Sequence, residues 1–220
     1  MPKVFLGVGH GGTDSGAIGN GFKEKDLNLS IALACNEVLT HHGIVVMMSR
    51  TIDENDNISE EIKECDNFKP DLAIDIHNNA GGGDGAECFY HHAGGKGKIL
   101  AENVLAEIVK TGQNSRGIKT RTNSDGKDYY AFIRETSAPA LIVECAFLDN
   151  YADIQILNTP DKQASMGIAI AKGILRTLGI PYVQTSKIYK VQVGAYSIKS
   201  NAIILQNKLK SQGYNAFIVE

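Results

Sequence analysis

Continuous apolar runs alternate with stretches of helical periodicity along the first 180 residues, and this alternation limits the fold more than any other feature. The runs 44–48 and 72–76 are apolar almost throughout, and a helical pattern over 57–68 separates them. Strands covered on both faces have such runs, whereas strands with one solvated face alternate. The sequence therefore predicts an α/β fold: a mostly parallel, mixed sheet of about six strands with helices on both faces.

The same patterns place the remaining elements of this domain, which we expect to span residues 1–180. Strands are expected at 3–9, 44–48, 72–76, 85–90, 129–133 and 140–146, and helices at about 23–42, 57–68, 99–109 and 159–178. Gly43 and Gly179 are typical helix stops, and Pro160 suits a first helical position. Residues 113–128 are polar and predict no element.

A second, smaller unit is expected at the C-terminal end. Residues 181–187 have no periodicity and are typical of a linker. Alternating runs at 189–193 and 214–219 flank a helical pattern over 200–212, which predicts a βαβ unit within 188–220. So short a unit buries little apolar area by itself.

Composition excludes several classes of function. Apolar residues make up 43% of the chain and the net charge is −3, so a basic nucleic-acid-binding surface is not expected. Four separate cysteines without CxxC spacing predict reduced core thiols. No run approaches the ~20 apolar residues that span a bilayer, which predicts no membrane insertion. The N-terminal residues lack the pattern of a signal peptide, so we expect synthesis in the cytoplasm.

Four residues are candidates for chemistry. His10 follows the first apolar run within a glycine-rich loop, and His77 follows the third. Ligands of parallel sheets gather outside the carboxyl ends of the strands. Glu144 interrupts the last apolar run, where a buried carboxylate is costly without a partner. Glu24 lies near a helix start, where a glutamate is more often a partner of the helix dipole.

Together these residues suit a metal site. Two imidazoles and one carboxylate are typical zinc ligands that leave a position for water. A further carboxylate can then move the proton of that water. Asp75, one strand period before His77, is a candidate hydrogen-bond partner for the imidazole or a polar edge residue. His91 and His92 are expected on a surface loop.

One motif points elsewhere. Residues 7–12 match GxGxxG after a strand, the dinucleotide fingerprint. That motif requires a helix to begin at once, whereas here a glycine-rich loop continues to Gly21. The second strand also ends in Arg50 rather than in an acidic residue for a ribose, so we take the match as accidental.

Four motifs in order resemble a known family. They are Gly9–Ala17 with Gly21–Glu24, Ile76–Ala80, Arg134–Thr136 and Val143–Asn150. Residues 2–180 thereby resemble the zinc-dependent N-acetylmuramoyl-L-alanine amidases of the Amidase_3 family. The resemblance implies one Zn²⁺ held by His10, Glu24 and His77, with Glu144 as the catalytic carboxylate. Asp75 and Ala146 depart from the family, which often has serine and glycine there.

The resemblance also sets the expected function: hydrolysis of the amide between N-acetylmuramic acid and L-alanine in peptidoglycan. Residues 188–220 resemble the first half of a SPOR-type wall-binding domain, through Lys190–Tyr196. Arg134 is a candidate for gripping a substrate carboxylate or, alternatively, for a surface ion pair. We expect action at the cell wall after release by phage or mother-cell lysis. Two alternatives stay open: a zinc peptidase cutting within the stem peptide, and a non-catalytic wall-binding protein.

Overall fold

The computed structural model describes residues 1–184, 191–214 and 216–219. They form two units, Met1–Val183 and Gln184–Glu220, so the boundary falls inside the expected linker. Each unit is described by itself.

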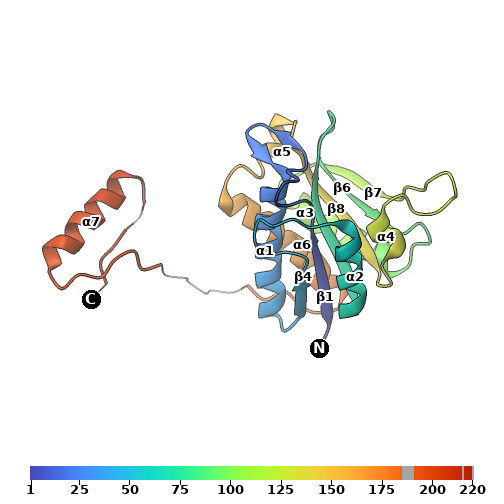
Figure 1. The fold of residues 1–220 in the computed structure, drawn as a ribbon, viewed down its shortest axis with the longest axis horizontal. Helices are drawn as coiled ribbons and strands as arrows, with labels where there is room; N and C mark the ends of the chain where they lie inside the picture. Colours follow the sequence, from blue (N-terminus) through green and yellow to red (C-terminus); the bar gives the residue numbers. More distant parts are fainter. Residues whose placement is uncertain (185–190, 215, 220) are drawn as a thin grey trace. The chain divides into compact units, whose positions relative to one another are not determined.

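The first unit is built on one six-stranded sheet (Figure 1). Its order is β4 (Val45–Met48), β1 (Lys3–Val8), β5 (Leu72–Asn79), β8 (Ala140–Phe147), β6 (Ala86–Tyr90) and β7 (Ser115–Lys119). The first four strands are parallel, β6 is antiparallel to β8, and β7 is parallel to β6. The predicted mixed, mostly parallel sheet is confirmed.

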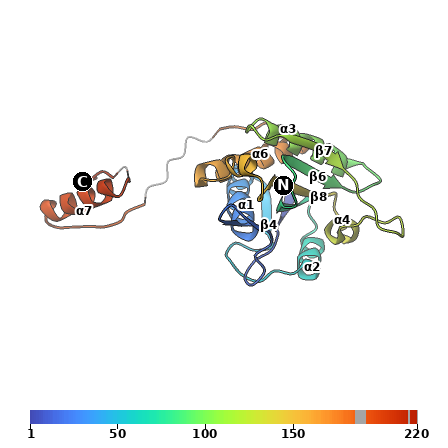
Figure 2. The same cartoon turned by 90° about the horizontal axis from the view of Figure 1, so that it is seen from above.

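Helices cover both faces of this sheet (Figure 2). On one face α1 (Glu24–His41), α3 (Lys96–Val109) and α6 (Pro160–Thr177) enclose the larger core. On the other, α2 (Ile58–Phe68) and α4 (Ala131–Glu135) cover a smaller core. Successive side chains of a strand point to opposite faces, so Leu6 and Ile74 enter the larger core while Phe5 and Ala73 enter the smaller one. Burial on both faces explains why the sequence runs lack alternation.

Two short elements differ from expectation. Residues 129–133 were expected as a strand, but they lead into α4 instead. Phe132 and Ile133 of this helix are buried in the smaller core. The place beside β6 is taken by β7, in a stretch for which no element was expected. Burial in the smaller core and an occupied sheet edge thus outweigh the strand propensity of the aromatic run.

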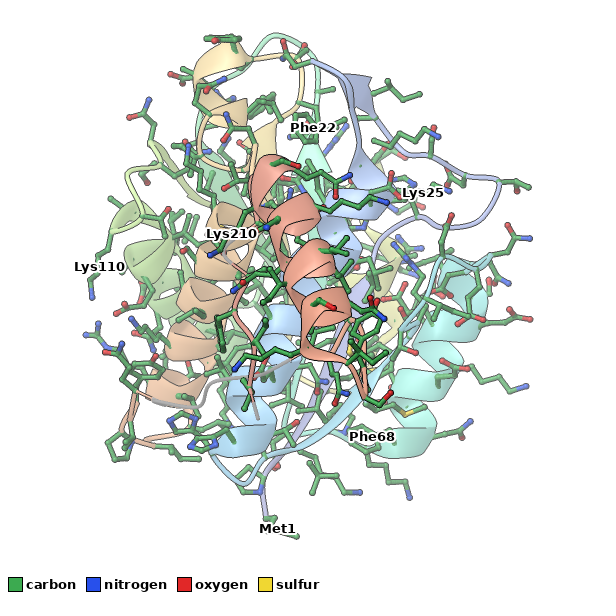
Figure 3. All side chains as sticks on the ribbon, turned by 90° about the vertical axis from the view of Figure 1, so that its left-hand side faces the viewer. Met1, Phe22, Lys25, Phe68, Lys110 and Lys210 are labelled. Atoms are coloured by element: carbon green, nitrogen blue, oxygen red, sulfur yellow. The ribbon has the colours of Figure 1, made fainter. Side chains whose placement is uncertain are left out.

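Further short elements lie in the loops. A hairpin of β2 (Ile18–Gly19) and β3 (Phe22–Lys23) precedes α1, and α5 (Tyr151–Ile154) follows β8. Met1 lies at the end of the unit opposite Phe22 and Lys25, so β1 runs toward the hairpin (Figure 3).

The second unit contains one helix, α7 (Lys199–Ser211), close to the expected range. The expected strands are not formed at 191–193 or 216–219, and residues 189, 190 and 215 lie outside the described part of the chain. α7 buries none of its residues: Leu205 and Leu209 are only half-buried, and Ile203 and Ile204 are exposed. An isolated strand pair without a covering face is marginal in water, which is consistent with this outcome.

All four cysteines are buried free thiols, as predicted. Among the residues the structure describes, no helix is long and apolar enough to cross a membrane.

Candidate metal centre and active site

The candidate residues gather on the sheet face that α2 and α4 only partly cover. Under these helices the face is apolar, and further along the strands it turns polar. His77 on β5, Glu144 on β8 and Glu87 on β6 are register partners and form one row across three neighbouring strands. Neighbouring strands lie about 4.8 Å apart. The site therefore rises from the face of the sheet, and only His10 lies beyond a strand end as expected.

Glycines of β1 and the loop after it make room for this row. A Cβ on Gly9 would lie 2.2 Å from Cε1 of His77, so a larger residue would occupy the imidazole's place. A Cβ on Gly16 would lie 2.5 Å from Cδ2 of His10 and 2.6 Å from Oε2 of Glu24. These glycines are explained by close approach of the site's own side chains.

His10 enters the site from the loop after β1. Its φ of 64° is in the left-handed region, which is unusual for a residue other than glycine. Nδ1 of its ring lies 2.8 Å from Oδ2 of Asp14, which orients the imidazole and leaves Nε2 facing Glu24. The loop is held from below by the buried Arg50, whose Nε donates to the Val8 carbonyl at 3.0 Å. Strain at His10 is thus supported by a fixed surrounding.

Glu24 is the first residue of α1 and is buried. The β2–β3 hairpin folds back so that the Ala17 amide donates to Oε2 at 2.9 Å, while the Asn78 amide donates to Oε1 at 3.1 Å. Oε2 then lies 3.2 Å from Nε2 of His10, and Oε1 lies 2.9 Å from Nδ1 of His77. The Glu24 carboxylate, at the start of α1, therefore contacts both imidazoles. The sequence alone left open whether it would.

His77 is oriented by Asp75. Its Nε2 lies 3.1 Å from Oδ2 of Asp75, which leaves Nδ1 toward Glu24. A carboxylate behind a ligating histidine fixes the ring and its tautomer in metal sites. Glu61 of α2 is buried close to Asp75, and burial together with that neighbouring charge raises the pKa of Glu61 well above its usual value. Asp75 is the carboxylate that contacts Nε2 of the imidazole.

The three donors fit a divalent transition metal. One atom each from His10, Glu24 and His77 lies within 4.8 Å of the others. The rings of the two histidines are nearly perpendicular, with centroids 5.1 Å apart, so their nitrogens converge without stacking. Two imidazoles and one carboxylate suit Zn²⁺ with an open coordination position.

The charges of these groups are strongly coupled. Burial alone would raise the pKa of Glu24, but hydrogen bonds from His10 and His77 outweigh it and hold that pKa well below the usual range. Its carboxylate in turn raises the pKa of His10. For His77, burial lowers the pKa, yet the charge of Asp75 and the hydrogen bonds to Asp75 and Glu24 together outweigh burial and raise it well above the ordinary value. The site therefore attracts positive charge, whether protons or a cation.

Glu144 differs from its neighbour Glu87 in the row. Glu87 binds Arg116 Nε at 2.8 Å and also pairs with Lys119, and these cations lower its pKa although burial acts in the opposite sense. Oε2 of Glu144 is buried and has no hydrogen-bond partner among the described residues. Burial raises the pKa of Glu144 to about 7. The pKa values of two adjacent carboxyl groups are thus shifted in opposite directions, and Glu144 is suited to take up and release a proton near neutral pH.

Arg134 lies elsewhere. Its Nη1 donates to the carbonyls of Asp128 and Tyr129, each at 2.9 Å, and Nη2 pairs with Glu135 at 2.6 Å. These contacts all lie within the loop before α4 and the helix itself, and none involves a residue of the metal-binding group. The guanidinium therefore holds the loop before α4.

Sequence patterns did not identify Glu61, Glu87, Arg116 or Lys119 as parts of this face. These residues join it through sheet pairing and the packing of α2, for which no local signal exists. Only the GxGxxG-like glycines gave a hint, since their spacing with His10 suggested a crowded backbone.

Comparison with known proteins decides the family. The family model for N-acetylmuramoyl-L-alanine amidases, Amidase_3, matches residues 4–176. The chain belongs to this family. Residues 171–220 match the model of the SPOR domain. As a member of Amidase_3 the protein is a peptidoglycan hydrolase of the amidase type, and its substrate is peptidoglycan.

Relatives of this amidase agree over most of its length. A sporulation-specific N-acetylmuramoyl-L-alanine amidase of Bacillus subtilis is 32% identical over all of this chain and 85% of its own. An endolysin of Bacillus phage SPP1 is 31% identical over 80% of this chain and 66% of its own. The catalytic domain of CwlV, an amidase of Paenibacillus polymyxa, superposes with a TM-score of 0.74 at 29% identity, covering 82% of this chain and 100% of its own. Cwp6 from Clostridium difficile superposes with a TM-score of 0.79 at 40% identity, over 80% of this chain and 29% of its own.

Proposed function

We propose that this amidase uses a divalent metal, Zn²⁺, held by His10, Glu24 and His77, to cleave the bond between N-acetylmuramic acid and L-alanine. The observation that carries the proposal is the convergence of these three donors beside the half-buried Glu144, whose Oε2 is buried and has no hydrogen-bond partner in the described part of the chain. A Zn²⁺ ion bound there supplies Lewis acidity, which polarises the scissile carbonyl and lowers the pKa of water to about 7.

The chain's own residues then move the protons. Glu144, with a pKa of about 7, accepts a proton from the attacking water on its unpaired Oε2. As the amide carbon–nitrogen bond breaks, the same carboxyl group donates that proton to the departing nitrogen of alanine. Asp14 and Asp75 keep the two imidazoles in place throughout.

Arg134 remains a prediction as a substrate contact. Its guanidinium is engaged by backbone carbonyls of the loop before α4, so a direct grip on a substrate carboxylate would require some of these bonds to open. We propose instead that it positions this loop.

We also propose that the domain over 1–180 is catalytic and that residues 188–220 form a partial wall-binding module. Action at the wall after lysis is proposed from the relatives, which include both a sporulation-specific amidase and a phage endolysin.

The test is mass spectrometry of purified peptidoglycan digested by the full chain. New L-alanine amino termini without new reducing sugars are expected. New termini of another amino acid would support a stem-peptide peptidase instead, and no product at all would support a wall-binding protein. Glu144→Gln should retain metal by elemental analysis and lose hydrolysis. Cleavage by that variant at a near wild-type rate would refute the assigned role of Glu144.

A further inference from the structure

A second cluster of metal-ligating side chains lies outside the active site. It joins two loops: the one after β6, which carries His91 and His92, and the one between β7 and α4, which carries Asp128. Nε2 of His91 lies 3.1 Å from Oδ2 of Asp128, and Nδ1 of His92 lies 2.7 Å from the same oxygen. Asp128 is buried, while the two imidazoles are partly exposed.

The arrangement matches the active-site group in donor set and spacing. Among the residues the structure describes, only these two groups bring three such donors within 4.8 Å of one another. Each offers two imidazole nitrogens and one buried carboxylate. In the first group the nitrogens lie 2.9 and 3.2 Å from the two different oxygens of Glu24, and in the second they lie 2.7 and 3.1 Å from the same oxygen of Asp128. A His₂-carboxylate set with open positions is a common site for divalent transition metals.

Local contacts fix the carboxylate for this task. The His92 amide donates to Oδ1 of Asp128 at 2.9 Å, so Oδ2 is the oxygen presented to both rings. The two imidazoles stack with centroids 4.6 Å apart and planes 22° apart, and one nitrogen of each ring lies beside Oδ2. Because the rings are exposed on their outer side, an ion can enter and keep water ligands.

Without a metal, hydrogen bonds alone would hold this cluster. The Ala93 amide donates to Nδ1 of His91 at 3.1 Å, so a neutral His91 ring carries its hydrogen on Nε2, toward Asp128. A metal on Nε2 moves the ring hydrogen to Nδ1, which then can no longer accept from the Ala93 amide, so metal binding exchanges that hydrogen bond for the metal–nitrogen bond. The number of ions that one chain binds therefore distinguishes a metal-bound cluster from one that is only hydrogen-bonded.

We propose that His91, His92 and Asp128 form a second divalent-metal site, separate from the amidase centre and structural in role. It ties down the loop before α4. That loop carries Tyr130, whose ring packs 4.9 Å from Phe89, and Tyr129, on which Arg121 stacks at 3.7 Å. Phe89 is two residues from Glu87 on the same strand face, so a bound ion fixes an aromatic wall beside the active-site row.

The test is the number of Zn²⁺ ions bound by the full chain after chelator treatment, measured by calorimetric titration and by elemental analysis. Wild type should bind two ions per chain. His92→Gln and Asp128→Asn should each bind one, Glu24→Gln should bind one, and Glu24→Gln combined with His92→Gln should bind none. His41 and His42 provide the matched control: they are also adjacent in sequence but belong to no such group in the described residues. His41→Gln should still bind two ions.

Hydrogen exchange gives a second readout that a folding defect would not imitate. In the Glu24→Gln background, adding Zn²⁺ should slow amide exchange in residues 120–130 at least several-fold, and His92→Gln should abolish this protection. A single ion per wild-type chain that His92→Gln retains, or two ions in His92→Gln, would overturn the proposal, whereas a single ion that His92→Gln loses would count against the active-site metal instead. Unchanged exchange in residues 120–130 on adding Zn²⁺ would overturn the structural role.

Discussion

Replacing Gly9 with alanine should disable the amidase while leaving its fold intact. The new Cβ would lie 2.2 Å from Cε1 and 2.3 Å from Nε2 of His77. Restoring an ordinary contact of 3.4 Å requires the ring to move by about 1.2 Å. Asp75 and Glu24 hold that ring at 3.1 and 2.9 Å, so the movement breaks both contacts. A misplacement of about 1 Å at a catalytic group costs on the order of 100-fold in rate.

The assay is kcat/KM on purified walls, with zinc content and thermal unfolding measured on the same samples. We expect Gly9→Ala to lose about 100-fold or more in kcat/KM. Gly43→Ala is the matched control: Gly43 has a φ of 75° at the end of α1, and a Cβ added there would meet nothing within 4 Å. That variant should lose about 1–2 kcal/mol of stability through backbone strain and keep its activity. Gly9→Ala with wild-type activity would refute the reasoning that this glycine exists to admit the His77 ring.

Three further predictions concern the carboxylates around the metal. Since the ionised form of Glu144 accepts the proton, kcat/KM should rise with pH and level off at or below about pH 7, because a bound cation lowers the pKa of Glu144. A rate that falls from pH 5 to 7 would contradict the role of Glu144 as the base. In the metal-free chain the raised pKa of Glu144 means that ionising this group costs stability above pH 7 but not below 4.5, the pKa of the group in the unfolded chain. Glu144→Gln should therefore stabilise the metal-free chain at pH 8 by at most about 3 kcal/mol, measured by urea unfolding. An equal destabilisation would argue against burial as the cause of the raised pKa. Asp75→Asn should weaken zinc binding by about 10–100-fold in titration. The control Asp71→Asn, at the opposite end of the sheet, should leave zinc affinity unchanged. Equal zinc affinities of the two variants would rule out Asp75 as the partner that orients His77.

Sequence patterns predicted the main elements because their signals are local. Strands with continuous apolar runs and helices with capped ends, such as the helix after Asn57, appear where expected since each pattern is complete within a dozen residues. The four principal site residues could likewise be chosen from motifs, and three of them are brought together as donors. The tail shows the limit of such patterns: the alternation at 191–193 suits a strand, yet no strand forms there.

Other features were decided only by tertiary structure. Residues 131–135 became a helix because β7 occupies the sheet edge and the smaller core needs Phe132 and Ile133. Pairing of Glu144 with both His77 and Glu87 follows from strand order, which no local pattern encodes.

The alternation of apolar runs and helical stretches thus determined the sheet, and with it the strand end that His10 follows and the strand that carries His77. It could not determine which face would carry the chemistry, or that Glu24 would close onto both imidazoles. Those outcomes depend on a two-strand hairpin, a buried Arg50 and the space left by Gly9, which act between segments far apart in the chain. Local propensity acts within a few residues, whereas a metal site requires donors fixed to within about 0.5 Å by packing from all sides.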